Sequence, residues 1–496
     1  MAHRRAPSPA DPHPPPLAAH AVVVGASFAG LAAAQALSHH VERVTIVERD
    51  DLPERPSARP GVPQGRHLHV LQPGGSAALE RLLPGFQAEL LAAGATELRV
   101  PEDVLWMTPA GWAPRVGGRR ADHVLLAASR ELTEWAVRRR VYESPQILVR
   151  AGLEVRGLVV RDGRVQGVDV RSWHAEQDAP TVTIDADIVV DASGRGSDAA
   201  DWLDAAGLEP PAETVIDSDL VYASRMYRRT PGDTPGWKGA LIQANPPHEP
   251  RGAILFPIEG NRWLLTMSAA GGDEPPKDEA GFTAFARSLR APDVADVIER
   301  AEPLGTIATY RRTENRWRHY ERMDRPDGFL AVGDALRAFN PLYGQGISTA
   351  ALAAEALDRG LGTQLERGRD LAGFSAHAQP ELVKASAGAW LIATGVDLRY
   401  PTVKGDTRGR VERARDALVV RYMDRVTRAA THDPVVNAAL FDAVSLLAEP
   451  WSLMRPGIAW RALRPGPRTP SPRPVWPAGS APAAGPAPVA DGRAAE

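Results

Sequence analysis

Short apolar runs alternate with helical patterns near the start of the chain. Residues Ala21–Val24 form a continuous apolar run before a glycine, which is typical of a strand buried on both faces. Phe28–His39 predicts a helix with Leu31 and Leu37 on one face, and Arg43–Glu48 predicts a second buried strand. A strand, a helix and a parallel strand in this order predict a right-handed βαβ unit.

The middle of the chain has the patterns of strands. Val155–Asp169 predicts a hairpin, because the pair Asp162-Gly163 in its middle is a typical turn. Ile184–Val190 is predicted as one strand that leads into a glycine-rich loop. Between residues 205 and 320, several strand-like runs predict an antiparallel sheet inserted into the α/β domain. These runs are Leu220–Tyr227, Ala253–Pro257 and Trp263–Ser268.

Helical patterns occur in three further regions. Ser76–Leu83 and Leu132–Arg140 predict helices in the first third of the chain. Phe329–Val332 predicts another buried strand, which is followed by a glycine-punctuated turn and a helix over Ile347–Leu357. Leu361–Trp460 is mainly helical in pattern. The tail after Leu463 is rich in Pro, Ala and Gly, which predicts disorder.

Composition and charge exclude several classes of site and partner. The chain has 496 residues, enough for two or three domains. Without cysteine it cannot form disulfides, iron–sulfur clusters, cysteine-ligated zinc or a flavin linked through cysteine. A net charge of −3 gives no global field for nucleic acid or an anionic membrane, and we expect neither as a partner. The first lysine is Lys238, which excludes mechanisms that need an earlier lysine.

The first residues of the chain do not predict export or a membrane anchor. Residues 1–20 lack the apolar stretch of a signal peptide. Leu17–Leu37 is nearly uncharged and long enough to resemble a membrane span. It contains Val22–Val24 and then a glycine-bearing turn, however, so a buried strand that leads into a helix explains it better. Nothing in the sequence indicates an oxidising compartment, and we expect a cytoplasmic protein.

The turn between the first strand and the first helix has a glycine pattern suited to phosphate. Gly25 permits a tight turn, Ser27 is small enough for a pyrophosphate to approach, and Gly30 lets the helix pack closely on the strand. Free N–H groups and the positive end of the helix dipole would then face the phosphates. Glu48 ends the second strand, where an acidic residue accepts hydrogen bonds from an adenosine ribose. The loop alone does not separate FAD from NAD.

A second glycine-rich segment, Gly333–Gly346, lies about 300 residues later, between a predicted strand and a predicted helix. An NAD-binding domain has no need of such an element, whereas the flavin end of FAD projects far from its adenine end. Asp334 can bind ribityl hydroxyls, and Pro341 and the glycines let the backbone approach the flavin ring. The helix that opens near Gly346 directs its positive end at the pyrimidine edge, where negative charge develops on reduction.

These motifs resemble a known family. They are similar to those of FAD-dependent aromatic hydroxylases of the para-hydroxybenzoate hydroxylase type. The GVPQGRHLH segment resembles more closely a branch that includes the flavin epoxidases of polyether polyketide biosynthesis. The matching stretches run from residue 22 to about residue 355 and read VVVGASFAGLAAAQAL, VTIVERD, GVPQGRHLHVL, SRELTEW, DIVVDASGRGS and GDALRAFNPLYGQGIS.

The resemblance assigns the ADP half of non-covalently bound FAD to the first part of the chain. The residues that would hold it are Gly25, Ser27, Gly30 and Glu48. Arg130 matches an arginine that contacts the cofactor near its phosphate and ribityl region. The backbone of Val155 matches a position that touches adenine.

The flavin half falls on later residues. Asp334 would hold the ribityl chain, and the residues at the flavin ring would be Gly344, Gln345 and Gly346. The candidates near the reacting face are Arg66, His67, Pro341 and Tyr343. His67 and His69 have the spacing of neighbours on one face of a strand, but no third ligand is evident, so we expect no metal.

The implied fold class is α/β, with a Rossmann-like FAD-binding domain, an inserted antiparallel-sheet substrate domain and a helical C-terminal region. The expected divisions are a disordered N-terminus (1–20), the first part of the FAD-binding domain with substrate-side segments around 85–120 (21–204), the substrate-binding sheet (205–320), the second part of the FAD-binding domain (321–360), the helical region (361–463) and a disordered tail (464–496).

The resemblance implies a monooxygenase that acts in secondary metabolism. Reduced flavin would take up molecular oxygen as a C4a-hydroperoxide and pass one oxygen atom to a small apolar organic substrate, by hydroxylation or epoxidation. The loop Asp191–Gly196 departs from the Asp-Gly form of the hydroxylases. Direct use of NAD(P)H and supply of electrons by a partner flavin reductase are therefore both open.

Three alternatives share the FAD-binding motifs. A prenyl or alkene reductase would use the same fold for hydride transfer, and a flavin-binding protein without catalysis would keep the binding residues alone. A halogenase would need an early lysine and a Trp-x-Trp-x-Ile-Pro motif, and the sequence has neither.

Overall fold

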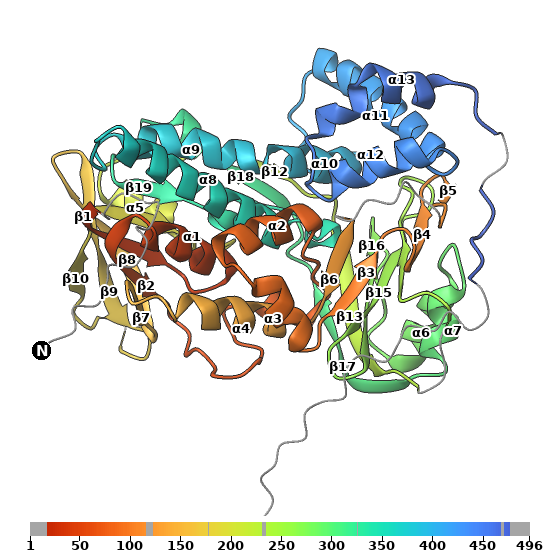
Figure 1. The fold of residues 1–496 in the computed structure, drawn as a ribbon, viewed down its shortest axis with the longest axis horizontal. Helices are drawn as coiled ribbons and strands as arrows, with labels where there is room; N and C mark the ends of the chain where they lie inside the picture. Colours follow the sequence, from red (N-terminus) through yellow and green to blue (C-terminus); the bar gives the residue numbers. More distant parts are fainter. Residues whose placement is uncertain are drawn as a thin grey trace, which may run out of the picture.

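The computed structural model describes residues 17–115, 123–176, 178–230, 235–324, 326–467 and 471–476. An α/β part lies beside a large antiparallel sheet, and C-terminal helices form a third part above them (Figure 1). This arrangement confirms the predicted fold class. Residues 1–16, which make up most of the predicted disordered N-terminus, lie outside the described residues. None of the helices in the described ranges combines the length and apolar character that crossing a bilayer requires.

A five-stranded parallel sheet forms the centre of the α/β part, in the order β19-β11-β1-β2-β7. The strands are β1 (Leu17–Val24), β2 (Val41–Val47), β7 (Ile147–Arg150), β11 (Ile188–Asp191) and β19 (Phe329–Ala331). The inner strands are continuous apolar runs because other elements cover both faces of the sheet. β1 begins four residues before the predicted Ala21, since Leu17 pairs with Val41 and its N–H donates to His40 O.

The helices of this part pack in a layer over the parallel sheet. They are α1 (Phe28–Ser38), α2 (Pro73–Leu82), α3 (Phe86–Ala92), α4 (Arg130–Val141) and α8 (Gly346–Glu366). α8 packs against both α1 and α2. It extends well beyond the predicted end at Leu357, because Leu361 and Gln364 continue its buried face at helical spacing. α2 and α4 begin slightly earlier than predicted, and the Ser129 hydroxyl caps α4 by accepting from Leu132 N–H (3.1 Å).

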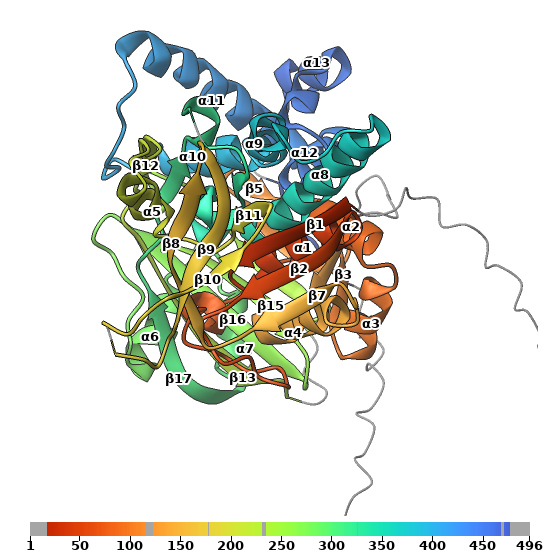
Figure 2. The same ribbon diagram turned by 90° about the vertical axis from the view of Figure 1, so that its left-hand side faces the viewer.

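A three-stranded antiparallel sheet, β10-β9-β8, packs beside the parallel strands (Figure 2). Its strands are β8 (Leu153–Arg161), β9 (Arg164–Ser172) and β10 (Val182–Asp185). The predicted hairpin turn at Asp162-Gly163 is confirmed. The single strand predicted over Ile184–Val190 is wrong: β10 ends at Asp185 and β11 begins at Ile188. Asp187 N–H donates to His20 O between them, where the chain passes from one sheet to the other.

The inserted sheet has seven strands in the order β17-β13-β16-β15-β14-β4-β5. They are β4 (Val104–Thr108), β5 (Gly111–Trp112), β13 (Leu220–Arg228), β14 (Gly239–Ile242), β15 (Gly252–Ile258), β16 (Arg262–Ala270) and β17 (Glu302–Tyr310). Helices α6 (Glu279–Arg287) and α7 (Asp293–Ile298) cover one face with an apolar core. Because β4 pairs with β14 in parallel, the sheet includes residues from well before position 205.

Short elements connect these layers. They are the pair β3 (Thr96–Arg99) and β6 (Val124–Ala127), the set β12 (Glu213–Ile216), β18 (Asn315–Arg318) and β20 (Arg337–Ala338), the helix α5 (Ala199–Ala205), and the 3-10 turns at Pro63–Arg66, Tyr320–Arg322, Gly333–Ala335 and Pro341–Tyr343.

The C-terminal region is helical, as predicted. Its elements are α9 (Phe374–Ala385), α10 (Ala387–Asp397), α11 (Arg410–Ala430), α12 (Pro434–Val444), a 3-10 turn at Pro450–Met454 and α13 (Pro456–Leu463). α11, α12 and α13 share a small apolar core of their own. This core is separate from the core of the parallel sheet.

Part of the tail packs on the inserted sheet, so disorder over 464–496 is wrong for residues 471–476. The Trp476 indole packs against the core between the inserted sheet and α6–α7, and its N–H donates to Glu102 O (3.0 Å). Arg473 forms an ion pair with the buried Asp293. An indole can bury its ring and still satisfy its N–H group, which gives a Pro-rich segment one anchor. Residues 468–470 and 477–496 lie outside the described residues.

We expect Trp476→Ala to lower the free energy of unfolding by about 1–3 kcal/mol, because the half-buried ring and its hydrogen bond are lost together. Denaturant unfolding followed by fluorescence would measure this change. Trp451→Ala is the matched control, since that ring is 63% exposed and should contribute little. Equal stabilities of the two variants would contradict an anchoring role for Trp476.

Candidate functional site

A glycine turn joins β1 to α1 at the carboxyl edge of the parallel sheet. Gly25 has a φ of +100°, which favours glycine. A Cβ at Gly30 would lie 1.8 Å from the Gly25 carbonyl oxygen, so only glycine lets α1 begin this close to the strand. The N–H groups of the first turn of α1 have no partner within the helix and can receive an anion.

A cleft opens beside this turn, between α1, the loop after β2 and the start of α8. About 940 Å³ of space free of protein atoms lies within it, the open solvent at its mouth included. Six residues predicted from distant parts of the sequence meet in its lining. They are Ser27, Arg130, Asp334, Pro341, Gly344 and Gly346. The sequence did not indicate Tyr310, which also lines the cleft from the end of β17.

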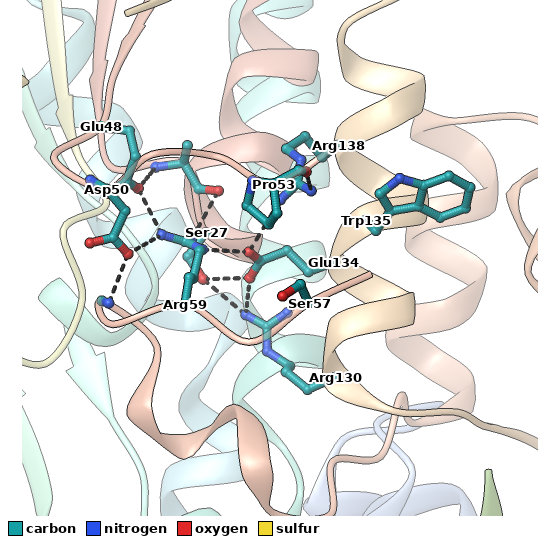
Figure 3. A network of polar contacts seen from close by, with 12 residues as sticks. Ser27, Glu48, Asp50, Pro53, Ser57, Arg59, Arg130, Glu134, Trp135 and Arg138 are labelled. Atoms are coloured by element: carbon teal, nitrogen blue, oxygen red, sulfur yellow. Dashed lines mark hydrogen bonds and ion pairs between the residues drawn. The ribbon is translucent and has the colours of Figure 1, made fainter. Parts of the chain in front are cut away.

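A buried group of charged side chains lies behind the cleft (Figure 3). Arg59 Nη1 is 2.9 Å from Asp50 Oδ2 and 3.3 Å from Glu48 Oε2, and its Nε donates to Glu134 Oε1 (2.9 Å). Burial opposes the charge of Arg59, but Glu134 and Glu48 outweigh it and raise the pKa of the guanidinium above its ordinary value. The group therefore stays ionised and ties the loop at residues 48–59 to α4.

Sequence reasoning missed Arg59 and Glu134. Glu134 has a local signal, because it lies one helical turn after Arg130 in SRELTEW. Arg59 has none, because Glu48 and Asp50 lie across an irregular loop from it and Glu134 comes from α4. The roles predicted for Glu48 and Val155 stay predictions. The Glu48 carboxylate accepts from Ala26 N–H (2.7 Å) and Asp50 N–H (3.0 Å), and neither Glu48 nor Val155 lines the cleft.

Arg130 brings an unpaired N–H group to the cleft. Its Nη2 donates to Ser27 Oγ (2.9 Å) and lies 2.9 Å from Glu134 Oε2. Its Nη1 is buried and has no hydrogen-bond partner among the described residues. An unpaired N–H of a buried charged group is costly, and a bound oxyanion would satisfy it. Together with the turn at Gly25, this donor fits the phosphates of FAD.

The second glycine segment forms the opposite end of the cleft. A Cβ at Gly333 would lie 2.5 Å from Ala29 Cβ, so this segment approaches the start of α1. Asp334 lines the cleft, and burial raises the pKa of its carboxyl group, while Arg195 and other arginines oppose that effect. α8 begins at Gly346. The Gln345 side chain is buried and contacts Val444 O (3.4 Å), so it packs towards α12 instead of the cleft.

A fully buried carboxylate, Asp397 at the end of α10, fixes the turn at Pro341–Tyr343. It accepts from Tyr343 Oη (2.5 Å), Asn315 Nδ2 (2.6 Å) and Asn340 Nδ2 (3.1 Å). Burial raises the pKa of Asp397 to about 6, against hydrogen bonds that favour the ionised form. The Tyr343 hydroxyl, which was a candidate at the reacting face, is therefore used to hold the turn.

A smaller pocket, with free space for about one water molecule, adjoins the cleft on the side of the inserted sheet. Its lining is Leu68, Tyr222, Ile254, Thr266, Pro341 and Leu342. Pro341 also lines the cleft, so the two spaces meet at this residue. The mainly aliphatic and aromatic lining suits an apolar molecule.

His67 lies behind this pocket. Its Nδ1 is 2.8 Å from Ser224 Oγ, and its ring meets Tyr222 edge to face with centroids 4.6 Å apart. Burial, with the charge of Arg66, lowers the pKa of His67 to about 4, so the ring is neutral at pH 7. Arg66 itself is exposed, and neither Arg66 nor His67 lines either space in the described residues. Their place at the reacting face stays a prediction.

His69 lines the cleft, and its Nδ1 contacts His67 O (3.0 Å). Burial, with Arg130, lowers the pKa of His69 to about 3. The described residues contain one group of side chains that could share a metal ion, and it does not include His67 or His69. That group is His39, His40 and Asp358, at the other end of α1.

Comparisons with known proteins agree with this geometry. Residues 18–372 match the FAD binding domain family. Protein Rv3254 of Mycobacterium tuberculosis (strain ATCC 25618 / H37Rv) is 33% identical over 439 residues, which cover 86% of this chain and 90% of that protein.

Two solved structures share the fold. The flavin-dependent brominase Bmp2 is 14% identical with a TM-score of 0.60, over 86% of this chain and 93% of its own. The anhydrotetracycline hydroxylase OxyS of Streptomyces rimosus is 16% identical with a TM-score of 0.56, over 86% of this chain and 76% of its own. At these identities the likeness concerns the fold alone.

We expect Arg130→Ala to weaken FAD binding about ten- to a hundredfold, because a charge-assisted hydrogen bond is worth about 1.5–3 kcal/mol. Titration of apoprotein with FAD, followed by flavin fluorescence, would measure the dissociation constant. Arg139→Ala on the same helix is the control, since that side chain is 53% exposed and pairs with Glu89. Unchanged affinity in Arg130→Ala would mean that Nη1 does not meet the cofactor.

We also expect the titration of Asp397 to lower the free energy of unfolding as the pH rises. Its pKa of about 6 in the folded protein lies above the ordinary 3.8, so its contribution to stability is fully present below about pH 4 and lost as pH rises through about 6. The loss is on the order of 1–3 kcal/mol. Denaturant unfolding of wild type and Asp397→Asn between pH 4.5 and 8 would isolate this slope. Parallel curves for the two proteins would contradict the raised pKa.

Proposed function

The chain belongs to the FAD binding domain family, and we propose that it is an FAD-dependent monooxygenase that transfers one oxygen atom from molecular oxygen to a small apolar organic substrate. Hydroxylation of an aromatic ring and epoxidation of an alkene are both included, since they need the same oxygen donor. We place the substrate among secondary metabolites, by analogy with the tetracycline-type substrate in the name of OxyS.

One observation carries this proposal: the apolar pocket adjoins the flavin end of the cleft across Pro341. A substrate in the pocket would lie beside the part of the cleft bounded by Gly344 and the start of α8. The inserted sheet forms the far wall of the pocket through Tyr222, Ile254 and Thr266. Oxygen transfer needs this proximity and the exclusion of water, because water would divert the reactive oxygen.

The protein contributes binding, orientation and charge. Bound FAD supplies the electrons and activates the oxygen for this reaction. Arg130 and the first turn of α1 would hold the phosphates, and Asp334 would hold the ribityl chain. The positive end of α8 at Gly346 stabilises negative charge at the flavin end of the cleft. Asp397 keeps the Pro341–Tyr343 turn in place between cofactor and substrate.

The source of electrons is either NAD(P)H bound directly or a partner flavin reductase. In the loop Asp191–Gly196, Asp191 is fully buried and accepts from the hydroxyls of Ser193 (2.5 Å) and Ser197 (2.6 Å). Its carboxylate is therefore used inside the loop. This arrangement favours supply by a reductase.

A halogenase would share the fold, as Bmp2 does, and the position of the first lysine favours the monooxygenase. Lys238 lies just before β14, where it donates to Asp103 Oδ2 (2.9 Å), and it lines neither the cleft nor the pocket in the described residues. A lysine held in this way cannot relay an oxidised halide to a substrate. A prenyl or alkene reductase is the second alternative.

Chemically reduced holoenzyme, mixed with a panel of apolar arenes and alkenes under ¹⁸O-labelled oxygen, should give a product heavier by one labelled oxygen atom. Mass spectrometry after a single turnover would detect it without a known reductase, and free reduced FAD is the control. Label taken up from water instead would refute the oxygen-transfer mechanism. A gain of two hydrogens would identify a reductase, and bromination in added bromide would identify a halogenase.

A further inference from the structure

One face of the inserted sheet carries a patch of hydroxyl groups beside the apolar pocket. Residues directly opposite each other on neighbouring strands point to the same face of a sheet. Tyr222 on β13 lies opposite Tyr310 on β17 and Ser268 on β16. Two positions along β13, Ser224 lies opposite Thr266 and therefore belongs to the same face. Most of the residues that line the pocket are therefore apolar, but one wall carries hydroxyl groups.

Two of these hydroxyls already have partners. Thr266 Oγ1 accepts from Leu68 N–H (3.1 Å) and lies 2.6 Å from Ser224 Oγ, which in turn lies 2.8 Å from His67 Nδ1. This chain satisfies both hydroxyls and joins the sheet to the loop that carries His67. It leaves no free donor for a ligand at Ser224.

Two further hydroxyls of the patch, those of Tyr222 and Ser268, have no partner within the described ranges. Tyr222 is 2% exposed, yet neither its Oη nor Ser268 Oγ has a hydrogen-bond partner among the described residues. The Tyr222 ring is held between the His67 ring and the Tyr310 ring, which is stacked on it at 5.4 Å. A buried polar group without a partner is destabilising, and such groups in native proteins usually have a ligand, a water or a function to explain them.

Tyr222 lies on the side of the sheet that faces the cofactor cleft. It lines the apolar pocket, and its stacking partner Tyr310 lines the cleft. Burial raises the pKa of Tyr222 well above its ordinary value; Tyr310 and Asp334 add to this rise, and Arg195 opposes it. The hydroxyl therefore keeps its proton at any working pH and can act only as a neutral donor or acceptor.

We propose that the substrate carries a hydrogen-bond-accepting oxygen, such as a ketone or quinone carbonyl. The Tyr222 hydroxyl donates a hydrogen bond to this oxygen, with Ser268 as a second donor. This inference rests on the proposed function, because it concerns the substrate of that site. The apolar remainder of the substrate lies against Leu68, Ile254 and Leu342. The hydroxyls are enclosed, so side chains that line the pocket rearrange when the substrate enters, while Asp397 holds the Pro341–Tyr343 turn. Anchoring at one oxygen determines which carbon lies next to Pro341 and the flavin end of the cleft.

The test compares matched ligands that differ in one acceptor oxygen. Oxidised holoenzyme is titrated with 1-tetralone and with tetralin, and with acetophenone and cumene, while the flavin absorption spectrum reports binding. We expect wild type to bind each ketone about tenfold more tightly than its hydrocarbon, since a site with a buried donor disfavours a ligand that leaves it unpaired. Tyr222→Phe should reduce this ratio to within about twofold.

Tyr227→Phe is the matched control. Tyr227 lies on the same strand and is equally buried, but it faces the opposite side of the sheet and packs with the α6–α7 core. It should keep the full preference. Ser268→Ala should reduce the preference in part. The thermal stability of ligand-free Tyr222→Phe should equal or exceed that of wild type, because an unpaired hydroxyl is removed.

The titration needs bound FAD but no turnover, so its outcome is separate from that of the oxygen-transfer experiment. If no ketone binds more tightly than its hydrocarbon, or if Tyr222→Phe keeps the wild-type ratio, the assignment of Tyr222 is overturned. A fall in the stability of ligand-free Tyr222→Phe would also overturn it, because an internal water would then be the partner of the hydroxyl.

Discussion

The buried ion cluster around Arg59 and Glu134 is the interaction on which the geometry of the site depends. Charges taken out of water are tolerated only when each has a partner, and loss of one partner typically costs about 3–5 kcal/mol. Here the partners come from the loop after β2 and from α4, so the two segments are held at a fixed spacing behind the first turn of α1. Glu134 is shared by Arg59 and Arg130. Because of that sharing, one N–H of Arg130 is left for an anion in the cleft.

A second buried polar group, around Asp397, fixes the position of the backbone at the other end of the cleft. Asp397 comes from the C-terminal helices, and its hydrogen bonds hold Asn340 and Tyr343 on either side of the turn where cleft and pocket meet. The C-terminal region therefore contributes to the site without lining it in the described residues. Between these two rigid ends, the inserted sheet supplies an apolar wall whose hydroxyls are either paired, as at Thr266, or available, as at Tyr222. Both ends of the cleft are therefore held rigidly, and the sheet between them offers only a few free hydrogen-bonding groups. This arrangement suits a cofactor with one reactive end.

The parts of the structure that local patterns determine could be predicted from the sequence. The turn at Gly25–Gly30, the parallel strands and the segment from Asp334 to Gly346 are dictated by glycines and apolar runs in fixed order, and the structure brings five of their predicted residues into one cleft with Arg130 of α4. Arg59, Asp397 and Tyr222 could not be found in this way, because their partners are distant in the sequence. The break at Asp187 escaped prediction for the same reason: the pattern of Ile184–Val190 can be read as one strand, and only pairing with two different sheets divides it. Arg66 is the opposite case. It lies in the GVPQGRHLH motif and was a candidate at the reacting face, but its side chain is exposed.

The discontinuity of the cleft has a consequence for the order in which the protein is made. Gly30 and Asp334 are separated by about 300 residues, yet they line or shape the same space, and β19 completes the parallel sheet only at residues 329–331. At about 5–20 residues per second, a ribosome needs roughly 15–60 seconds to pass from one to the other. During that interval the first βαβ unit is present without the edge of its sheet and without α8 above it. The complete cleft therefore forms only once the late strand and helix have docked, and FAD bound there stabilises that final assembly.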